Sequence, residues 1–80
     1  MKKYRIISTN SPAVPQIGYR ATKADFRMFG VGSVFTNRID ANIFAESSAS
    51  WASQFEVAMG YLVCLKKGTR WTVVDQFNSH

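Results

Sequence analysis

The chain has 80 residues, of which 46% are hydrophobic and 14% aromatic, and its formal net charge is +5. This length supplies one hydrophobic core but not two, and the composition is that of a folded chain, not of a disordered or low-complexity one. A single cysteine and a single histidine exclude an intramolecular disulfide and leave too few ligands for a zinc site.

The sequence shows no segment for membrane insertion or export. No apolar run approaches the ~20 residues of a transmembrane helix, and the cations Lys2 and Lys3 are not followed by the apolar stretch of a signal peptide. The one thiol, Cys64, needs only a reducing compartment, and the one histidine, His80, is terminal. We therefore expect a cytoplasmic protein without membrane association, bound metal or cofactor.

The charge is distributed unevenly along the chain. Residues 1–38 carry seven Lys and Arg against one acid, and residues 39–65 carry three acids and no Lys or Arg. Residues 66–80 again carry more cations than acids. This asymmetry predicts one basic surface, which would attract polyanions, and one neutral or acidic surface.

The first quarter of the chain predicts two strands joined by a loop. Residues 2–8 are rich in β-branched and aromatic side chains, with Tyr4 and Arg5 on opposite faces. Residues 9–16 contain both prolines and predict an irregular loop. The alternation of apolar side chains in residues 17–21 predicts the second strand.

Residues 23–29 allow two interpretations. They form a short helix if Thr22 and Asp25 cap it reciprocally. They contribute a strand to a hairpin if "TKAD" is a turn, which would set Arg20 beside Arg27. We slightly favour the hairpin.

The middle of the chain predicts a second hairpin followed by the main helix. Residues 31–35 and 38–45 flank "TN", and apolar residues alternate with others after that turn. From Ser48 onward apolar residues recur at steps of three and four, which predicts a helix over about 47–60. The large side chains that we expect to face the sheet are Trp51, Phe55 and Met59.

Residues 61–77 predict a third hairpin, because two β-rich runs flank Gly68, a residue suited to a tight turn. Lys66, Lys67 and Arg70 then lie at its tip. The expected fold is α+β: a single domain over residues 1–80, with an antiparallel sheet of about four to six strands packed on one main helix.

Basic residues next to aromatic ones recur along the chain, a pairing that suits phosphates and unpaired bases. In "RMFGVGSVF", Arg27, Phe29 and Gly30 follow the order found in the RNA-reading strand of RRM domains. The positions between and after them, Met28 and Val31 among others, depart from that pattern. The likeness therefore carries no functional inference.

Signatures of catalysis are missing from the sequence. The segment "GVG" lacks the third glycine and the following helix of a dinucleotide-binding loop. The acidic residues do not show the spacing of a catalytic carboxylate pair. Cys64 could act as a nucleophile if the nearby Lys66 lowered its pKa, but a core position suits it better. We expect no catalytic residue and hence no enzyme.

Three hypotheses remain. In the first, the chain is an inhibitor or adaptor that docks a basic face on a protein or nucleoprotein partner; in the second, it binds DNA or RNA directly; in the third, it is a structural subunit that self-associates through a strand edge. We favour the first. The residues that we expect to contact the partner are Arg20, Lys23, Arg27, Lys66, Lys67 and Arg70.

In size, basic charge, cytosolic chemistry and lack of catalytic residues, the whole chain resembles the small phage-encoded proteins that block host defences, anti-CRISPR proteins among them. The resemblance rests on this general character and assigns no residue. It implies a non-enzymatic block, in the host cytoplasm, of the surface where a defence complex holds nucleic acid or recruits its nuclease.

Overall fold

The computed structural model describes residues 1–10 and 14–79. Part of the predicted loop over residues 9–16, and His80, fall outside these described residues. In chain order the elements are β1 (Tyr4–Thr9), β2 (Arg20–Ala21), α1 (Lys23–Phe29), β3 (Gly30–Phe35), α2 (Arg38–Gln54), β4 (Gly60–Lys67) and β5 (Arg70–Asn78).

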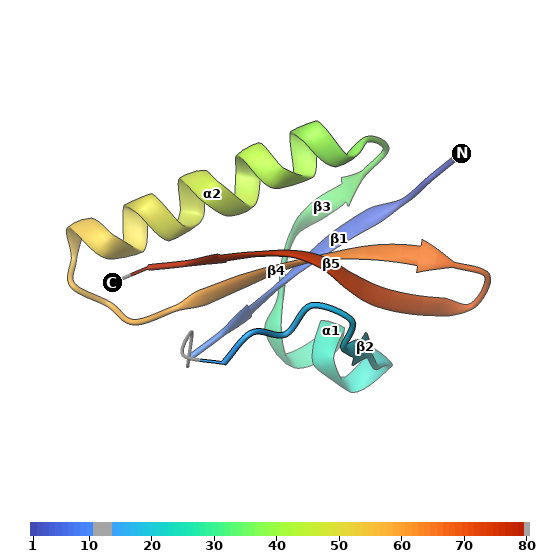
Figure 1. The fold of residues 1–80 in the computed structure, drawn as a ribbon, viewed down its shortest axis with the longest axis horizontal. Helices are drawn as coiled ribbons and strands as arrows, with labels where there is room; N and C mark the ends of the chain where they lie inside the picture. The colour runs from blue at the N-terminus through green and yellow to red at the C-terminus, as the bar shows by residue number, and fades with distance from the viewer. Residues whose placement is uncertain (11–13, 80) are drawn as a thin grey trace.

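The strands form one five-stranded sheet in the order β2-β5-β4-β1-β3, and every neighbouring pair is antiparallel. Figure 1 shows α2 lying along one side of this sheet and the shorter α1 on the other side. The predicted α+β class is confirmed, with an antiparallel sheet packed on one main helix.

The hairpin of β4 and β5 is confirmed as the sequence predicted it. Gly68 has a φ of 63° in the turn, a conformation that glycine adopts without steric cost. Lys67 faces Arg70 across the hairpin at its tip, and Lys66 faces Trp71. The turn therefore fixes the register of the two longest strands as far as Cys64 and Val73, beyond which a bulge shifts it by one residue.

Two apolar clusters fill the two sides of the sheet. On the α1 side, Phe26 packs with Cys64, Val73 and their neighbours from β1, β2 and β4. On the α2 side, Ala41 and Ala45 pack against other residues of β1 and β4. Residues that alternate along each strand therefore serve two cores, which is why β1 and β4 are apolar on both faces.

The favoured hairpin at residues 23–29 is wrong, because these residues form α1. The reciprocal cap is present: the Asp25 backbone N–H donates to the Thr22 hydroxyl, and the Thr22 N–H donates to the Asp25 carboxylate at 2.8 Å. These local bonds satisfy two amides that a helix start leaves unpaired, and they outweigh the brief alternation of apolar residues.

The predicted strand at residues 38–45 is also wrong, and the predicted helix over 47–60 is shifted. A single helix, α2, begins at Arg38 and ends at Gln54. Its first turn is capped by Asn37, whose side chain accepts a bond from the Asp40 N–H. The apolar residues Ile39, Ala41 and Ile43 alternate with the residues between them by chance. In the helix, Ile39 and Ala41 lie on different sides.

The face that α2 turns to the sheet consists of alanines, not of the large side chains that we expected. Ala41, Ala45, Ala49 and Ala52 are buried. Trp51 and Phe55 are exposed, so the prediction that they face inward is wrong. Small residues let the helix backbone approach the sheet closely, and they leave the large ones on the outside.

The predicted strand over residues 17–21 is shorter than expected, because only Arg20–Ala21 pairs as β2. The preceding residues run beside β5 without forming a regular ladder. Gly18 donates its N–H to the Val73 carbonyl, and Val73 donates its N–H to the Tyr19 carbonyl.

In the described residues, neither helix combines the length and the apolar character that a membrane crossing requires.

Candidate functional site

An open cavity of about 580 Å³ lies on the α1 side of the sheet, between α1, the N-terminal half of β1 and the tip of the β4–β5 hairpin. Its floor includes Phe26 and Trp71. Five cationic residues line it: Arg5, Arg20, Lys23, Arg27 and Arg70. Residues distant in sequence thus converge on one concave basic surface.

The cap of α1 sets the position of two of these cations. Lys23 and Arg27 are four residues apart and therefore project from neighbouring points of the helix surface. The Tyr19 hydroxyl donates to the Asp25 carboxylate at 2.8 Å and ties the preceding segment to the cap. The pKa of Asp25 is held below its usual value, mainly by the hydrogen bond from the Thr22 backbone N–H and to a smaller extent by those of the Tyr19 and Thr22 side chains.

Arg5 lines the cavity and lies against two aromatic rings. Its guanidinium carbon is 4.1 Å from the centre of the Phe26 ring and 5.6 Å from that of the Trp71 ring. The two rings meet edge to face at 5.2 Å. A cation over aromatic faces is stabilised by their negative charge density, so Arg5 is held in place while it remains charged.

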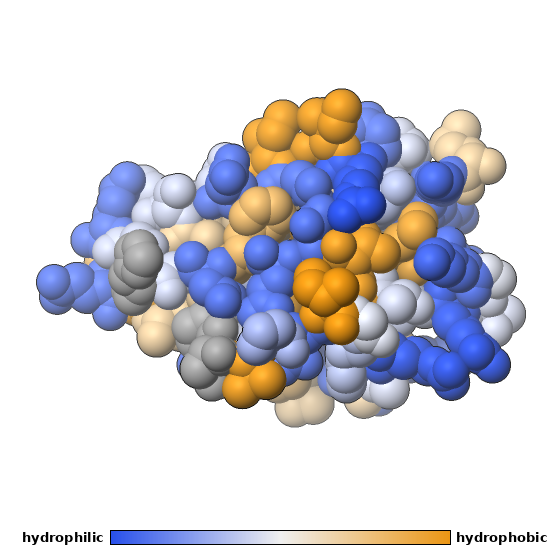
Figure 2. Space-filling model, viewed as in Figure 1, coloured by the Kyte–Doolittle hydropathy of each residue, from blue (hydrophilic) through white to orange (hydrophobic). Residues whose placement is uncertain are grey.

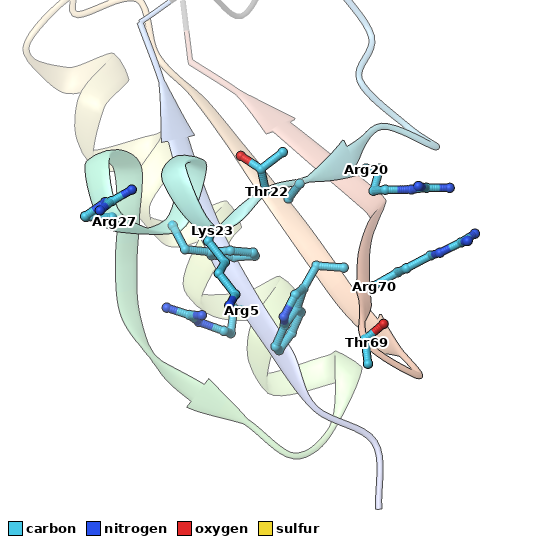
Figure 3. Close-up of a pocket in the computed structure, with 10 residues that line it drawn as sticks. Arg5, Arg20, Thr22, Lys23, Arg27, Thr69 and Arg70 are labelled. Carbon is cyan, nitrogen blue, oxygen red and sulfur yellow. The ribbon is translucent and has the colours of Figure 1, made fainter.

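The other four cations line the cavity from α1, β2 and β5. In Figure 3, Lys23 reaches from α1 over the cavity, Arg20 and Arg70 both extend outward on one side, and Arg27 projects away from them on the other side. The antiparallel pairing of β2 with β5 brings Arg20 close to the hairpin that carries Arg70.

No acid neutralises this surface within the described residues. The ion pair that the described residues form joins Arg38 to Asp75 at 2.7 Å. It attaches the start of α2 to β5, on the other side of the sheet from the cavity. Asp25, the acid beside the cavity, is engaged in the α1 cap and by Tyr19. The cavity therefore carries an excess of positive charge.

The structure brings together four of the six residues that the sequence proposed for partner binding: Arg20, Lys23, Arg27 and Arg70. Lys66 and Lys67 are exposed near the hairpin tip but do not line the cavity. Arg5 was not among the six. The alternation along residues 2–8 already placed it on the face of β1 opposite to Tyr4, and this was the signal in the sequence that could have pointed to it.

The nucleophile interpretation of Cys64 finds no support in its surroundings. The side chain is fully buried in the cluster under α1. Burial, more than the nearby Asp25, raises the pKa of its thiol to about 12. The thiol therefore stays protonated at neutral pH.

Across residues 1–10 and 14–79, no three His, Cys, Asp or Glu side chains group together as a metal site requires.

The aromatic rings of the cavity are in contact with Arg5. Phe26 is buried, and both its ring and that of Trp71 lie against the Arg5 guanidinium. Trp71 is half-buried and lines the cavity. The chemistry that the cavity offers is thus mainly attraction and hydrogen bonding to anionic groups, with the Trp71 ring beside them.

Comparison with protein-family models, with curated proteins and with solved structures finds no match for this chain.

Proposed function

We propose that the chain is a non-enzymatic binding module that docks its basic cavity on an anionic surface of a protein or nucleoprotein complex, as a small inhibitor or adaptor. The observation that supports this proposal is the convergence of five cations from β1, β2, α1 and β5 on one cavity without an acidic partner. Such a field speeds association with an acidic surface and orients the complex.

The shape of the site favours a protruding anionic group over a stack of bases. Arg5 lies against the Phe26 and Trp71 rings, and Arg20, Lys23 and Arg70 line the same cavity. Guanidinium groups bind carboxylates and phosphates through paired hydrogen bonds, so both an acidic loop and a phosphate backbone fit this chemistry. Occupation of a nucleic-acid-holding surface, as in the phage-encoded inhibitors that the chain resembles, is one form of this docking.

Direct binding of a nucleic acid backbone is the second candidate, because Arg20 and Arg70 extend outward where successive phosphates could reach both. This candidate predicts affinity for duplex DNA that falls steeply with salt. Docking on an acidic protein predicts instead a preference for a carboxylate polymer.

A matched pair of charge reversals tests the site. One variant carries Arg20→Glu and Arg27→Glu; the control carries Lys2→Glu and Lys3→Glu, which lie outside the cavity. Each reversal lowers the net charge by two, so both variants fall from +5 to +1. Differences between the two then report on place, not on net charge.

Binding is measured by fluorescence anisotropy with a short duplex DNA, a single strand and poly-glutamate at about 50 mM salt. We expect the cavity variant to lose at least tenfold in affinity for the preferred probe, and the control less than threefold. Preference for poly-glutamate supports the protein partner, and preference for duplex DNA supports the second candidate. Equal losses in the two variants, or no binding to any probe, would overturn the proposal.

A further inference from the structure

Arg5 is a half-buried cation whose hydrogen-bond donors have no partner among the described residues. Its guanidinium lies against the Phe26 and Trp71 rings, and neither the ion pair nor the side-chain hydrogen bonds of residues 1–10 and 14–79 include it. The ring contacts use none of its N–H groups. These groups therefore stay available for paired hydrogen bonds to an oxyanion.

Lys23 brings a second positive charge to Arg5. Both residues line the cavity, and in Figure 3 the Lys23 side chain extends from α1 toward Arg5. The acid beside the cavity, Asp25, is held by the α1 cap and by Tyr19, and it forms no ion pair with either cation. Two cations that converge without a counter-ion repel each other, and a ligand with two negative charges removes that repulsion.

Trp71 and Thr69 add neutral donors to the same cavity. The Trp71 ring is half-buried, and its indole N–H makes no hydrogen bond to the part of the chain that the structure describes. The exposed Thr69 hydroxyl lies in the turn between β4 and β5 and is likewise without a partner in that part of the chain. A ligand with several acceptor oxygens can use these donors together with the two cations.

A terminal phosphate fits this set of donors better than a carboxylate or an internal phosphodiester does. A phosphate monoester carries a charge of about −1.5 to −2 at neutral pH and three acceptor oxygens, whereas a carboxylate or a diester carries a single negative charge. The cavity has a volume of about 580 Å³ and is bounded by α1, β1 and the hairpin tip. A group at the end of a chain can enter it, whereas a diester has chain on both sides and stays at its mouth.

The surroundings of the cavity point to nucleic acid as the carrier of this phosphate. Arg20 and Arg70 both extend outward on one side, and Figure 2 shows hydrophilic surface over the tip of the β4–β5 hairpin, where β5 begins. These two cations suit the phosphates that follow in a strand, and the Trp71 ring suits an unpaired base. A phosphorylated side chain of a protein brings neither a series of phosphates nor a planar base.

We propose that the cavity binds the terminal phosphate monoester of a single-stranded nucleic acid, with Arg5 and Lys23 on the phosphate and Trp71 beside the terminal base. This inference rests on the proposed docking of the basic cavity on an anionic group, and it names that group. In a nucleoprotein partner, an exposed end of the nucleic acid strand supplies it.

Fluorescence anisotropy with one short single strand, labelled at an internal position, tests the inference at about 50 mM salt. The strand carries a 5′-phosphate, a 3′-phosphate or hydroxyls at both ends. We expect the protein to bind one of the phosphorylated forms at least tenfold more tightly than the hydroxyl form, and a serine-phosphorylated peptide no more tightly than the hydroxyl form. Equal affinity for all forms of the strand overturns the inference, as does tighter binding of the phosphopeptide than of either phosphorylated strand.

A matched pair of variants locates the phosphate. Lys23→Gln and Lys2→Gln each remove one charge from an exposed lysine, and of the two only Lys23 lines the cavity. Lys23→Gln should reduce the preference for the phosphorylated strand to less than threefold, and Lys2→Gln should retain it. Equal preference in the two variants would contradict the inference.

Tryptophan fluorescence gives an independent readout. Trp51→Phe replaces an exposed residue on the other side of the sheet and leaves Trp71 as the single tryptophan. Its emission should change when the phosphorylated strand is added to saturation, and change much less with the hydroxyl strand at the same concentration. Unchanged Trp71 emission at saturation would place the strand end outside the cavity and overturn the inference.

The same titrations separate this inference from the docking proposal. If the protein binds every form of the strand and poly-glutamate alike, and the variant with Arg20→Glu and Arg27→Glu loses affinity for all of them alike, the docking proposal holds and the terminal phosphate is ruled out. If the protein binds none of these probes, both proposals fail.

Discussion

Arg5 has two roles at the scale of the single residue. It supplies charge to the cavity, and its guanidinium lies against the rings of Phe26 and Trp71. A cation in such a position stabilises the fold as well as the site. Its contributions to folding and to binding can therefore be separated by substitution.

We expect Arg5→Ala to lower the free energy of unfolding by about 1 kcal/mol, because the stacked cation is lost and the rings are uncovered. Arg5→Lys keeps the charge but not the planar contact, so its free energy of unfolding should lie between those of the wild type and of Arg5→Ala. Urea unfolding measures both, with an unchanged slope confirming that the change is in stability. An Arg5→Ala midpoint equal to that of the wild type would show that the rings do not need this cover.

At the scale of the element, the end of α2 is tightly closed by an unusual residue. Val57 donates its N–H to the Ala52 carbonyl and Glu56 donates to the Ser53 carbonyl, the two bonds of a Schellman motif. The residue in the left-handed conformation is Glu56, with a φ of 56°, where glycine is usual. A side chain at this φ is strained.

Replacing Glu56 with glycine should therefore raise the free energy of unfolding by about 0.5–1 kcal/mol, since it removes the strain at some cost in chain entropy. For a domain of this size the midpoint of thermal unfolding should rise by ~2–8 °C. Glu56→Gln is the matched control, because it removes the charge and keeps the strain. Equal stabilisation by both variants would assign the effect to charge instead of backbone conformation.

The elements that the sequence predicted correctly are those whose signals are local. The β4–β5 hairpin follows from two β-rich runs and a glycine turn, and α1 was available as an alternative through its cap at Thr22 and Asp25. What failed was the position of α2. Its buried face consists of alanines, which contribute little to an apolar periodicity, whereas Trp51 and Phe55 dominate that periodicity from the exposed side.

The candidate site was partly predictable for a related reason. Charge asymmetry along the chain indicated a basic surface, and four of the six proposed residues do meet at the cavity. Arg5, which the prediction missed, belongs to β1, and the crossing of β1 beneath α1 brings it to Phe26. The alternation along β1 could place Arg5 on the face away from Tyr4, but its contact with Phe26 is set by the whole fold and not by a local pattern.

At the scale of the whole molecule, the sheet separates two surfaces of different chemistry. The basic cavity lies on the α1 side, and α2, with its exposed Ile39, Ile43 and Trp51, lies on the other (Figure 1). A substitution on the outer side of α2 should therefore leave the cavity unchanged.

This separation predicts that the two surfaces can be altered independently. Ile43→Glu adds a charge on the outer side of α2 and leaves the cavity residues intact, so its affinity for a short duplex DNA should stay close to that of the wild type. The cavity variant Arg20→Glu and Arg27→Glu should lose about tenfold or more under the same conditions, because it removes phosphate contacts. Anisotropy titrations at about 50 mM salt measure both affinities. A loss in Ile43→Glu as large as in the cavity variant would show that binding does not depend on the cavity.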